Sequence, residues 1–252
     1  MVPSLCTNLT MENSKMSKGI VISLYDFTGE ALKPWAEAGY TCYAFDIQHP
    51  VEGRTEGSIH YCYADLHSLD GFIDVMRTVV NKPVVFGMAF PVCTDMAVSG
   101  AAHFKRKAEL DPDFQTKAVA YAKQCADFFE AYHIPYFIEN PVSVLATKWR
   151  KPDYNFHPYE FGGYITDDQA EHPRWPEYIA SRDAYPKKTC LWTGGGFTMP
   201  WTDPVAPEQG HSRQHLKLGG KSQRTKDIRS ATPRGFATAV YEFNSIDEKE
   251  YA

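Results

Sequence analysis

Residues 19–48, GIVISLYDFTGEALKPWAEAGYTCYAFDIQ, contain the pattern that decides the fold. An apolar, β-branched run leads into a turn with Gly29, a stretch compatible with a helix, and a second apolar run that ends at Asp46. A strand, a helix and a second strand within about 30 residues are typical of the βαβ unit of a parallel sheet.

The same alternation continues along the chain. Residues 61–80 predict a short strand ending at Asp65 and then a helix, and KPVVFGMAF (82–90) predicts a strand that stops before Pro91. Residues 112–132 have apolar positions at helical spacing, and IPYFIEN (134–140) is again strand-like. We therefore predict an α/β fold with a doubly wound, mostly parallel, Rossmann-like sheet, whose ligands bind beyond the carboxyl ends of the strands.

Residues 142–222 interrupt this rhythm with many aromatic, proline and glycine residues. They predict an irregular insertion in a single domain of residues 19–252, preceded by a flexible N-terminus (1–18), and within the insertion KKTCLW (187–192) is strand-like. Residues 211–227, HSRQHLKLGGKSQRTKD, are expected to be a loop that orders on DNA or a disordered surface segment. Residues after 231 predict a helix with Thr232 as its N-cap and Pro233 at its first position.

Composition limits the classes of protein to consider. The chain has 252 residues, of which 43% are hydrophobic, enough for one α/β domain. It has no apolar run of about 18 residues, and its start lacks the apolar stretch of a secretory signal, so we expect a cytoplasmic protein without a membrane partner. Six cysteines without a C-x-x-C pair indicate mostly buried thiols, with neither a disulfide framework nor a structural zinc or other metal site.

The net charge of −5 is unevenly distributed. Residues 141–235 contain 14 Lys and Arg against 10 Asp and Glu, whereas the remainder contains 12 against 21. A basic half on an acidic body is typical of a protein with one face on phosphates, although solvated surface charge is the alternative interpretation.

Acidic residues follow three predicted strands, at Asp26, Asp46 and Asp65. In a Rossmann-like sheet the first turn needs glycine for close backbone approach, and an acid at the end of the second strand accepts ribose hydroxyls. Gly29 and Asp46 suit these roles, and Asp65 is placed to meet an adenine amino group. The alternative is that such an aspartate caps the next helix.

Two further strand ends contain reactive groups. Cys93 follows the strand at 82–90, where a thiolate would be an accessible nucleophile and a buried thiol would be inert. Glu139 and Asn140 end the next strand, and both side chains need polar partners there. Glu139 can hold and protonate a ring nitrogen, or the pair can form a surface turn before Pro141.

Together these segments resemble the DNA cytosine-C5 methyltransferases. FPVCTDMAVSG (90–100) is similar to their proline-cysteine motif, FIENPVSV (137–144) to their Glu-Asn-Val motif, and residues 23–40 to their cofactor loop. AYPKKTCLW (184–192) resembles their later substrate motif, and RSATPRGFATAV (229–240) resembles the C-terminal motifs that return to the cofactor pocket. The resemblance covers about residues 19–150 and 184–242, and it is nearest to the compact methyltransferase-like proteins of phages and prophages, which act in the cytoplasm of a bacterial host.

The resemblance implies S-adenosylmethionine as cofactor and cytosine-containing DNA as partner, with the base flipped out or single-stranded. In that family's mechanism Cys93 adds to C6 of cytosine, Glu139 acts at N3, and Asn140 fixes the Cys93 loop. The implied cofactor residues are Tyr25, Asp26, Phe27, Thr28, Gly29, Asp46, Ile47, Asp65, Leu66 and Pro91. The implied DNA contacts are Thr94, Ser99, Lys187, Lys188, Arg213, Lys217, Lys221, Arg224 and Arg229.

The chain departs from the family's pattern at several positions. Ser23 replaces the first aspartate of the cofactor loop, and Phe27 and Glu30 replace two of its glycines. The segment that reads the DNA sequence in this family is reduced to the irregular insertion. Two alternatives therefore remain: the same fold acting on a free cytosine nucleotide or RNA, and a catalytically degenerate decoy that binds DNA.

Overall fold

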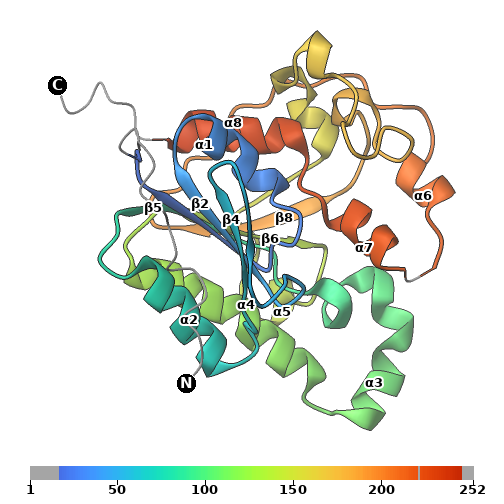
Figure 1. Ribbon diagram of the computed structural model, residues 1–252. Helices are drawn as coiled ribbons and strands as arrows, with labels where there is room; N and C mark the ends of the chain where they lie inside the picture. The colour runs from blue at the N-terminus through green and yellow to red at the C-terminus, as the bar shows by residue number, and fades with distance from the viewer. Residues whose placement is uncertain (1–16, 221, 246–252) are drawn as a thin grey trace. The chain divides into compact units, whose positions relative to one another are not determined.

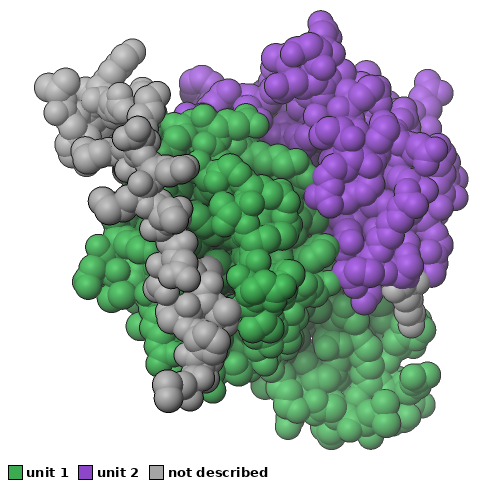
Figure 2. Space-filling model, viewed as in Figure 1, with its two compact units in different colours: residues 1–154, 190–197 green, residues 155–189, 198–252 purple. Residues whose placement is uncertain are grey.

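The computed structural model describes residues 17–220 and 222–245, which form two compact units (Figure 2). Unit 1 comprises the described residues of 1–154 together with 190–197, and unit 2 comprises the described residues of 155–189 and 198–252. The expected insertion is divided between the units, and most of the expected flexible N-terminus lies outside the described residues. No helix in the described ranges is long and apolar enough to span a membrane.

One sheet of eight strands has the order β3-β4-β2-β1-β5-β6-β8-β7 (Figure 1). The strands are β1 (Ile20–Leu24), β2 (Thr41–Asp46), β3 (Arg54–Glu56), β4 (Ile59–Tyr63), β5 (Val84–Ala89), β6 (Tyr136–Pro141), β7 (Tyr154–Phe156) and β8 (Thr189–Gly194). Strand β1 pairs in parallel with β2 and β5, β2 with β4, and β5 with β6, whereas β3 is antiparallel to β4. The predicted α/β class and mostly parallel sheet are confirmed, and they are consistent with a Rossmann-like fold.

The helices vary widely in length. The α-helices are α1 (Lys33–Glu37), α2 (Leu69–Val79), α3 (Phe104–Leu110), α4 (Phe114–Ala131), α5 (Leu145–Lys148), α6 (Arg213–Lys217), α7 (Gln223–Ser230) and α8 (Arg234–Asn244). The 3-10 helices are η1 (Glu30–Leu32), η2 (Cys93–Asp95), η3 (Val98–His103), η4 (Pro158–Tyr164), η5 (Asp167–Gln169) and η6 (Ser181–Asp183).

Both faces of the sheet are covered in unit 1. Alternate residues of β1, namely Ile20, Ile22 and Leu24, belong to the core that α2 and α4 complete. On the other face Trp35 of α1 stacks on Phe86 of β5, with ring centroids 4.8 Å apart. In Figure 1, α2 and α4 accordingly lie below the sheet and α1 above it. Because successive side chains of a strand point to opposite faces, burial on both sides explains why β1 is apolar at every position except Ser23.

The start of α2 packs tightly against the loop that follows β4. Ser68 is the N-cap, and its hydroxyl accepts a hydrogen bond of 3.1 Å from the backbone N–H of Gly71. Ser68 also donates, through its hydroxyl, to the carbonyl of Asp65 at 2.8 Å. The helix is therefore capped by Ser68 and not by Asp65, and a Cβ atom at Gly71 would lie only 2.0 Å from the Asp65 carbonyl oxygen.

Gly71→Ala should consequently destabilise unit 1. Because the clash is with backbone rather than a flexible side chain, we expect the free energy of unfolding to fall by about 3 kcal/mol. The urea midpoint, measured at an unchanged slope, tests this expectation. Gly100→Ala is the matched control, since its new Cβ would have its nearest neighbour, the Thr94 carbonyl oxygen, at 3.8 Å. Equal midpoints for the two variants would contradict the prediction.

Unit 2 consists largely of short helices around aromatic contacts. Phe236 of α8 stacks on Phe156, with centroids 4.1 Å apart, and meets Phe161 of η4 edge-on at 5.3 Å. A second cluster comprises Trp175, Ile179, Ala180, Tyr185, Leu218, Ile228 and Ala231. These contacts explain how a segment without regular periodicity still buries apolar surface.

Two sequence expectations for unit 2 are corrected. Residues 211–227 contain α6 and the start of α7, each begun by a serine N-cap, Ser212 and Ser222, rather than one irregular loop. Helix α8 begins at Arg234, with Pro233 and not Thr232 as its N-cap, because Pro233 has an extended backbone (φ −57°, ψ 128°).

Candidate active site at the carboxyl ends of the central strands

The direction of chain progression reverses between β1 and β5. The chain runs from β1 outward to β2 and β4, and then returns to the other side of β1 for β5 and β6. Leu24 of β1 is in register with Phe45 of β2 and Ala89 of β5, and Ala89 is in register with Ile138 of β6. The segments after these four residues therefore emerge side by side, at the place where open α/β sheets bind ligands.

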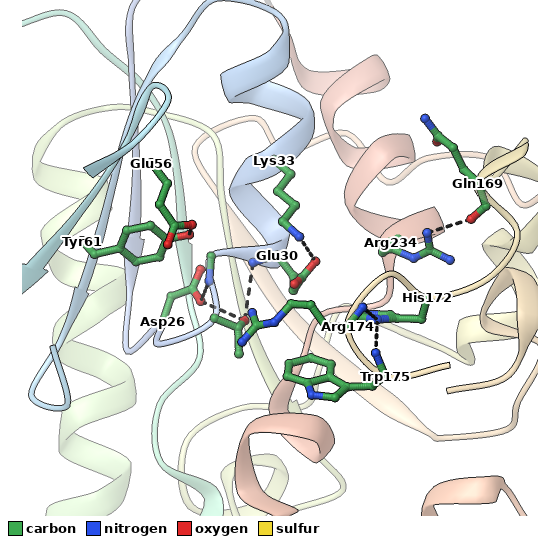
Figure 3. Close-up of polar contacts among 12 residues, drawn as sticks. Asp26, Glu30, Lys33, Glu56, Tyr61, Gln169, His172, Arg174, Trp175 and Arg234 are labelled. Atoms are coloured by element: carbon green, nitrogen blue, oxygen red, sulfur yellow. Dashed lines mark hydrogen bonds and ion pairs between the residues drawn. The ribbon is translucent and has the colours of Figure 1, made fainter. Parts of the chain in front are cut away.

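Hydrogen bonds to the side chain of Asp26 stabilise the loop after β1. The buried carboxylate of Asp26 accepts hydrogen bonds from the Ser23 hydroxyl and the Gly29 backbone N–H, both at 2.7 Å, and from the Thr28 hydroxyl at 3.3 Å. Asp26 is labelled in Figure 3, close to Glu30 of the same loop. Burial raises the pKa of Asp26, and the bonds from Ser23 and Gly29 oppose that rise. Ser23, where the resembled family has aspartate, is thus a donor to the loop's own carboxylate.

Gly29 and Tyr25 determine the path of this loop. Gly29 has φ +67°, and a Cβ atom there would lie 2.5 Å from the hydroxyl oxygen of Tyr61, so the turn requires glycine. Tyr25 also has a positive φ, of 58°, and its hydroxyl donates to the Leu66 carbonyl at 2.9 Å. Burial raises the pKa of Tyr25, which keeps the hydroxyl protonated for this bond.

Acceptors lie at the ends of β2 and β4. Asp46 is buried, and its Oδ1 accepts from the backbone N–H of Gln48 at 2.8 Å and from the Gln48 side chain at 3.0 Å. Asp65 Oδ1 accepts from the His67 N–H at 3.1 Å. No hydrogen bond to either Oδ2 atom comes from residues 17–220 or 222–245. Ile47, between β2 and Gln48, is 55% exposed.

His49 is a functional candidate that the sequence reasoning missed. Its buried ring stacks on Phe27, and its Nε2 lies 3.0 Å from the Asp26 carbonyl oxygen, to which it donates. Burial lowers the pKa of His49 and favours the neutral ring, so Nδ1 is an acceptor. This Nδ1 atom is buried and has no hydrogen-bond partner within the described ranges. Only the tertiary structure could reveal it, because the sequence shows an ordinary histidine before Pro50.

Cys93 lies at the start of η2, in the segment that follows β5. It is exposed, whereas Cys42, Cys62, Cys125 and Cys190 are buried, and Cys6 lies outside the described residues. Burial raises the pKa of the Cys42 and Cys125 thiols. Among the described cysteines, Cys93 is therefore the accessible thiol.

The end of β6 reaches the Cys93 loop through Asn140. This residue is 1% exposed, and its side-chain amide donates to the carbonyl of Pro91, two residues before Cys93, at 2.8 Å. Glu139 precedes Asn140 on the strand and is half-buried. Asn140 therefore links the end of β6 to the Cys93 loop, and Glu139 is the residue next to this link.

Backbone contacts join the loops after β5 and β6. Ala97 and Ser143 form an isolated antiparallel bridge, with hydrogen bonds from Val98 N–H to the Val142 carbonyl at 2.9 Å and from Val144 N–H to the Met96 carbonyl at 3.0 Å. The segment that contains Cys93 and the segment that follows Glu139 are thus held as one structure.

Where the end of β6 meets the Cys93 loop, two buried polar atoms lack a partner among the described residues: Asn140 Oδ1 and Ser143 Oγ. Buried polar atoms normally have one, so a ligand or an ordered water would complete both. The sequence gave no reason to select Ser143, because its place beside the Cys93 loop depends on pairing between distant segments.

Asn140→Asp should therefore weaken the link to the Cys93 loop. The substitution keeps the size of the side chain but replaces the donor with an acceptor facing the Pro91 carbonyl. We expect a loss of about 1–2 kcal/mol in the free energy of unfolding and a fall in kcat with little change in KM. Asn81→Asp makes the same chemical change at an exposed site and is the control. A wild-type kcat for Asn140→Asp would exclude the positioning role.

The described basic residues among those expected on DNA lie in unit 2, and four of them bind other parts of that unit. Lys187 donates to the Arg229 carbonyl at 2.9 Å, and Lys217 donates to the Glu177 carbonyl at 3.0 Å. Arg213 pairs with Glu208 at 2.5 Å. Arg229 itself donates to the Leu218 carbonyl at 2.7 Å.

The other expected DNA contacts differ in their surroundings. The guanidinium carbon of Arg224 lies 5.4 Å from the centre of the Tyr178 ring, and Lys188 is exposed. Thr94 and Ser99 are exposed in the segment after Cys93, and Lys221 lies outside the described residues.

No group of three or more His, Cys, Asp or Glu side chains suited to a metal ion occurs in the described part of the chain. Neither a scan against protein-family models nor a search of curated proteins found a match.

Proposed function

We propose that this protein transfers a methyl group from S-adenosylmethionine to C5 of cytosine in DNA, through a covalent bond between Cys93 and C6 of the ring. One observation carries the proposal: an exposed thiol follows β5, a carboxylic acid lies at the end of the neighbouring parallel strand β6, and the segments after these two strands are hydrogen-bonded to each other. The motif resemblance around both residues supports the same chemistry.

The proposed reaction assigns a separate task to each group. C5 of cytosine is a poor nucleophile until the Cys93 thiolate forms a bond to C6, which makes C5 electron-rich. Glu139 holds and protonates N3, which takes up the negative charge that the addition produces. After C5 has gained its methyl group from the sulfonium sulfur, which keeps the electron pair of the broken bond, a base removes the C5 proton. The electron pair restores the 5,6 double bond as the Cys93 thiolate leaves, N3 returns its proton to Glu139, and the base passes its proton to solvent. The enzyme returns to its starting state.

The acceptors at the ends of β2 and β4 fit S-adenosylmethionine, which supplies an electrophilic methyl group when bound. Asp46 would accept from its ribose hydroxyls and Asp65 from its adenine amino group, and the turn at Gly29 allows close backbone approach. His49 Nδ1 offers a further neutral acceptor. The buried carboxylate of Asp26 in this loop would repel the pyrophosphate of a dinucleotide, whereas it is compatible with a cationic cofactor; the neighbouring Glu30 is paired with Lys33 at 2.7 Å.

The strand order also agrees with the resemblance. Apart from the short edge strand β3, the order is β4-β2-β1-β5-β6-β8-β7, so the last strand in the chain lies between the two before it. The resemblance implies a doubly wound sheet, and this order, which reverses between β1 and β5, is of that kind.

Transfer of a labelled methyl group tests the proposal directly. The full chain is incubated with labelled S-adenosylmethionine and, separately, with duplex DNA, single-stranded DNA, RNA and dCMP. We expect label at C5 of cytosine in DNA. Label confined to RNA or to dCMP would favour the alternative substrates. DNA binding without transfer to any of the four would favour a degenerate decoy.

A further inference from the structure

A run of basic residues lies directly after the Cys93 loop. Helix η3 continues into α3, and the sequence HFKRK (103–107) spans their junction. Lys107 joins this helix to the loop, because its ammonium group donates to the Thr94 carbonyl at 2.7 Å and pairs with Asp95 at 2.5 Å. The basic turn of α3 is therefore bonded to the residue that follows Cys93.

The other two cations of this run are available for a ligand. Lys105 and Arg106 are exposed, and neither has a hydrogen bond or ion pair with any residue in 17–220 or 222–245. The nearest acids along the chain are Asp95, which pairs with Lys107, and Glu109. In Figure 1, α3 lies away from the sheet, in the segment between β5 and α4.

We propose that Lys105 and Arg106 on α3 bind the sugar-phosphate backbone of a nucleic acid strand whose cytosine is presented to Cys93. The inference rests on the proposed function and specifies its substrate as a polynucleotide rather than a free nucleotide. A base within a strand has phosphates on both sides, so cations on a helix that is bonded to the Cys93 loop would hold the strand while the base enters the site. Through Lys107, phosphate binding on α3 acts on the same loop that positions Cys93.

The contrast with unit 2 strengthens this assignment. Lys187, Arg213, Lys217 and Arg229 would have to give up internal hydrogen bonds or an ion pair before they could bind phosphate. Each such bond contributes about 1 kcal/mol, a cost that Lys105 and Arg106 do not have. Exposed cations without an internal partner are the groups that exchange counterions for phosphates most readily.

The salt dependence of binding tests the inference. The double variant Lys105→Gln/Arg106→Gln of the full chain is titrated against a fluorescent single-stranded oligonucleotide containing cytosine, and against its duplex, at several salt concentrations. The slope of log K against log salt is negative, and each lost phosphate contact makes it less steep by about 1. We therefore expect the slope of the double variant to be less steep than that of the wild type by about 2. Affinity should weaken by a similar factor for oligonucleotides of unrelated sequence.

A matched variant carries the same change of charge elsewhere in unit 1. Lys123→Gln/Lys151→Gln removes two exposed lysines, one on α4 and one after α5, and should keep the wild-type slope. An unchanged slope for Lys105→Gln/Arg106→Gln, or wild-type protein that binds neither oligonucleotide, would overturn the inference. The inference would also be overturned if Lys105→Gln/Arg106→Gln lost binding to phosphatidylserine vesicles but still bound the oligonucleotide, since the surface would then serve a membrane.

The binding assay and the transfer assay separate this inference from the proposed function. If the double variant still methylates dCMP but loses transfer to the oligonucleotide, the α3 surface is supported. If transfer to the oligonucleotide is unaffected, the α3 surface is refuted while the proposed chemistry stands. If no substrate is methylated but the slope is still less steep by about 2, the surface stands and the proposed chemistry fails.

Discussion

Cys93→Ala should abolish methyl transfer, with a fall in kcat of roughly 10⁴-fold or more. Loss of a covalent nucleophile has effects of this size in other enzymes, because the remaining groups have no alternative route to the intermediate. The rate of transfer from labelled S-adenosylmethionine to DNA measures the effect. A second measurement uses DNA containing 5-fluorocytosine, whose fluorine cannot leave as a proton does, so that the wild-type enzyme should remain bonded to the base.

Two comparisons make this result specific to the thiol. Cys93 is exposed, so Cys93→Ala should keep the wild-type urea midpoint, and inactivity could not then be attributed to unfolding. Cys93→Ser keeps the size of the side chain but replaces the thiol by a far less acidic hydroxyl, and it should also be inactive. Activity or a covalent adduct with Cys93→Ala would exclude the proposed mechanism.

Glu139→Gln should lower kcat by about 10²- to 10⁴-fold, the usual contribution of a general acid. Glutamine has nearly the same shape and can still approach N3, but it cannot transfer a proton to it. The rate of adduct formation with 5-fluorocytosine should fall together with kcat, since the proton is needed when Cys93 adds to the ring.

Glu37→Gln, at the exposed end of α1, is the matched control and should have the wild-type rate. If Glu139→Gln retained the wild-type kcat while Cys93→Ala was inactive, the thiol would keep its role and the acid would have to come from another residue.

The sheet was largely predictable because its central strands are buried on both faces. Strands β1, β2, β5 and β6 consist mostly of apolar residues, with polar residues or proline at or shortly after their carboxyl ends, so their positions follow from the hydrophobic pattern. Strand β3 has three exposed residues, and α3, α6 and α7 are short and rich in charge, so no apolar period marks them.

The basic run at 103–107 was also not predicted as a binding surface. Counting charge over long segments placed the basic surface in residues 141–235 and averaged the run at 103–107 into an acidic remainder. Three consecutive basic residues were visible in the sequence, but the bond from Lys107 to the Thr94 carbonyl was not.

By itself, the sequence determined that an α/β sheet forms, that Cys93 follows a strand and that Glu139 and Asn140 end the next one, because burial imposes the period of each element. Only the tertiary structure decided that β5 and β6 are neighbours, that Asn140 reaches Pro91, and that Cys93 alone among the described cysteines is exposed. Exposure and pairing depend on contacts between residues far apart in the chain, and no local pattern encodes such contacts.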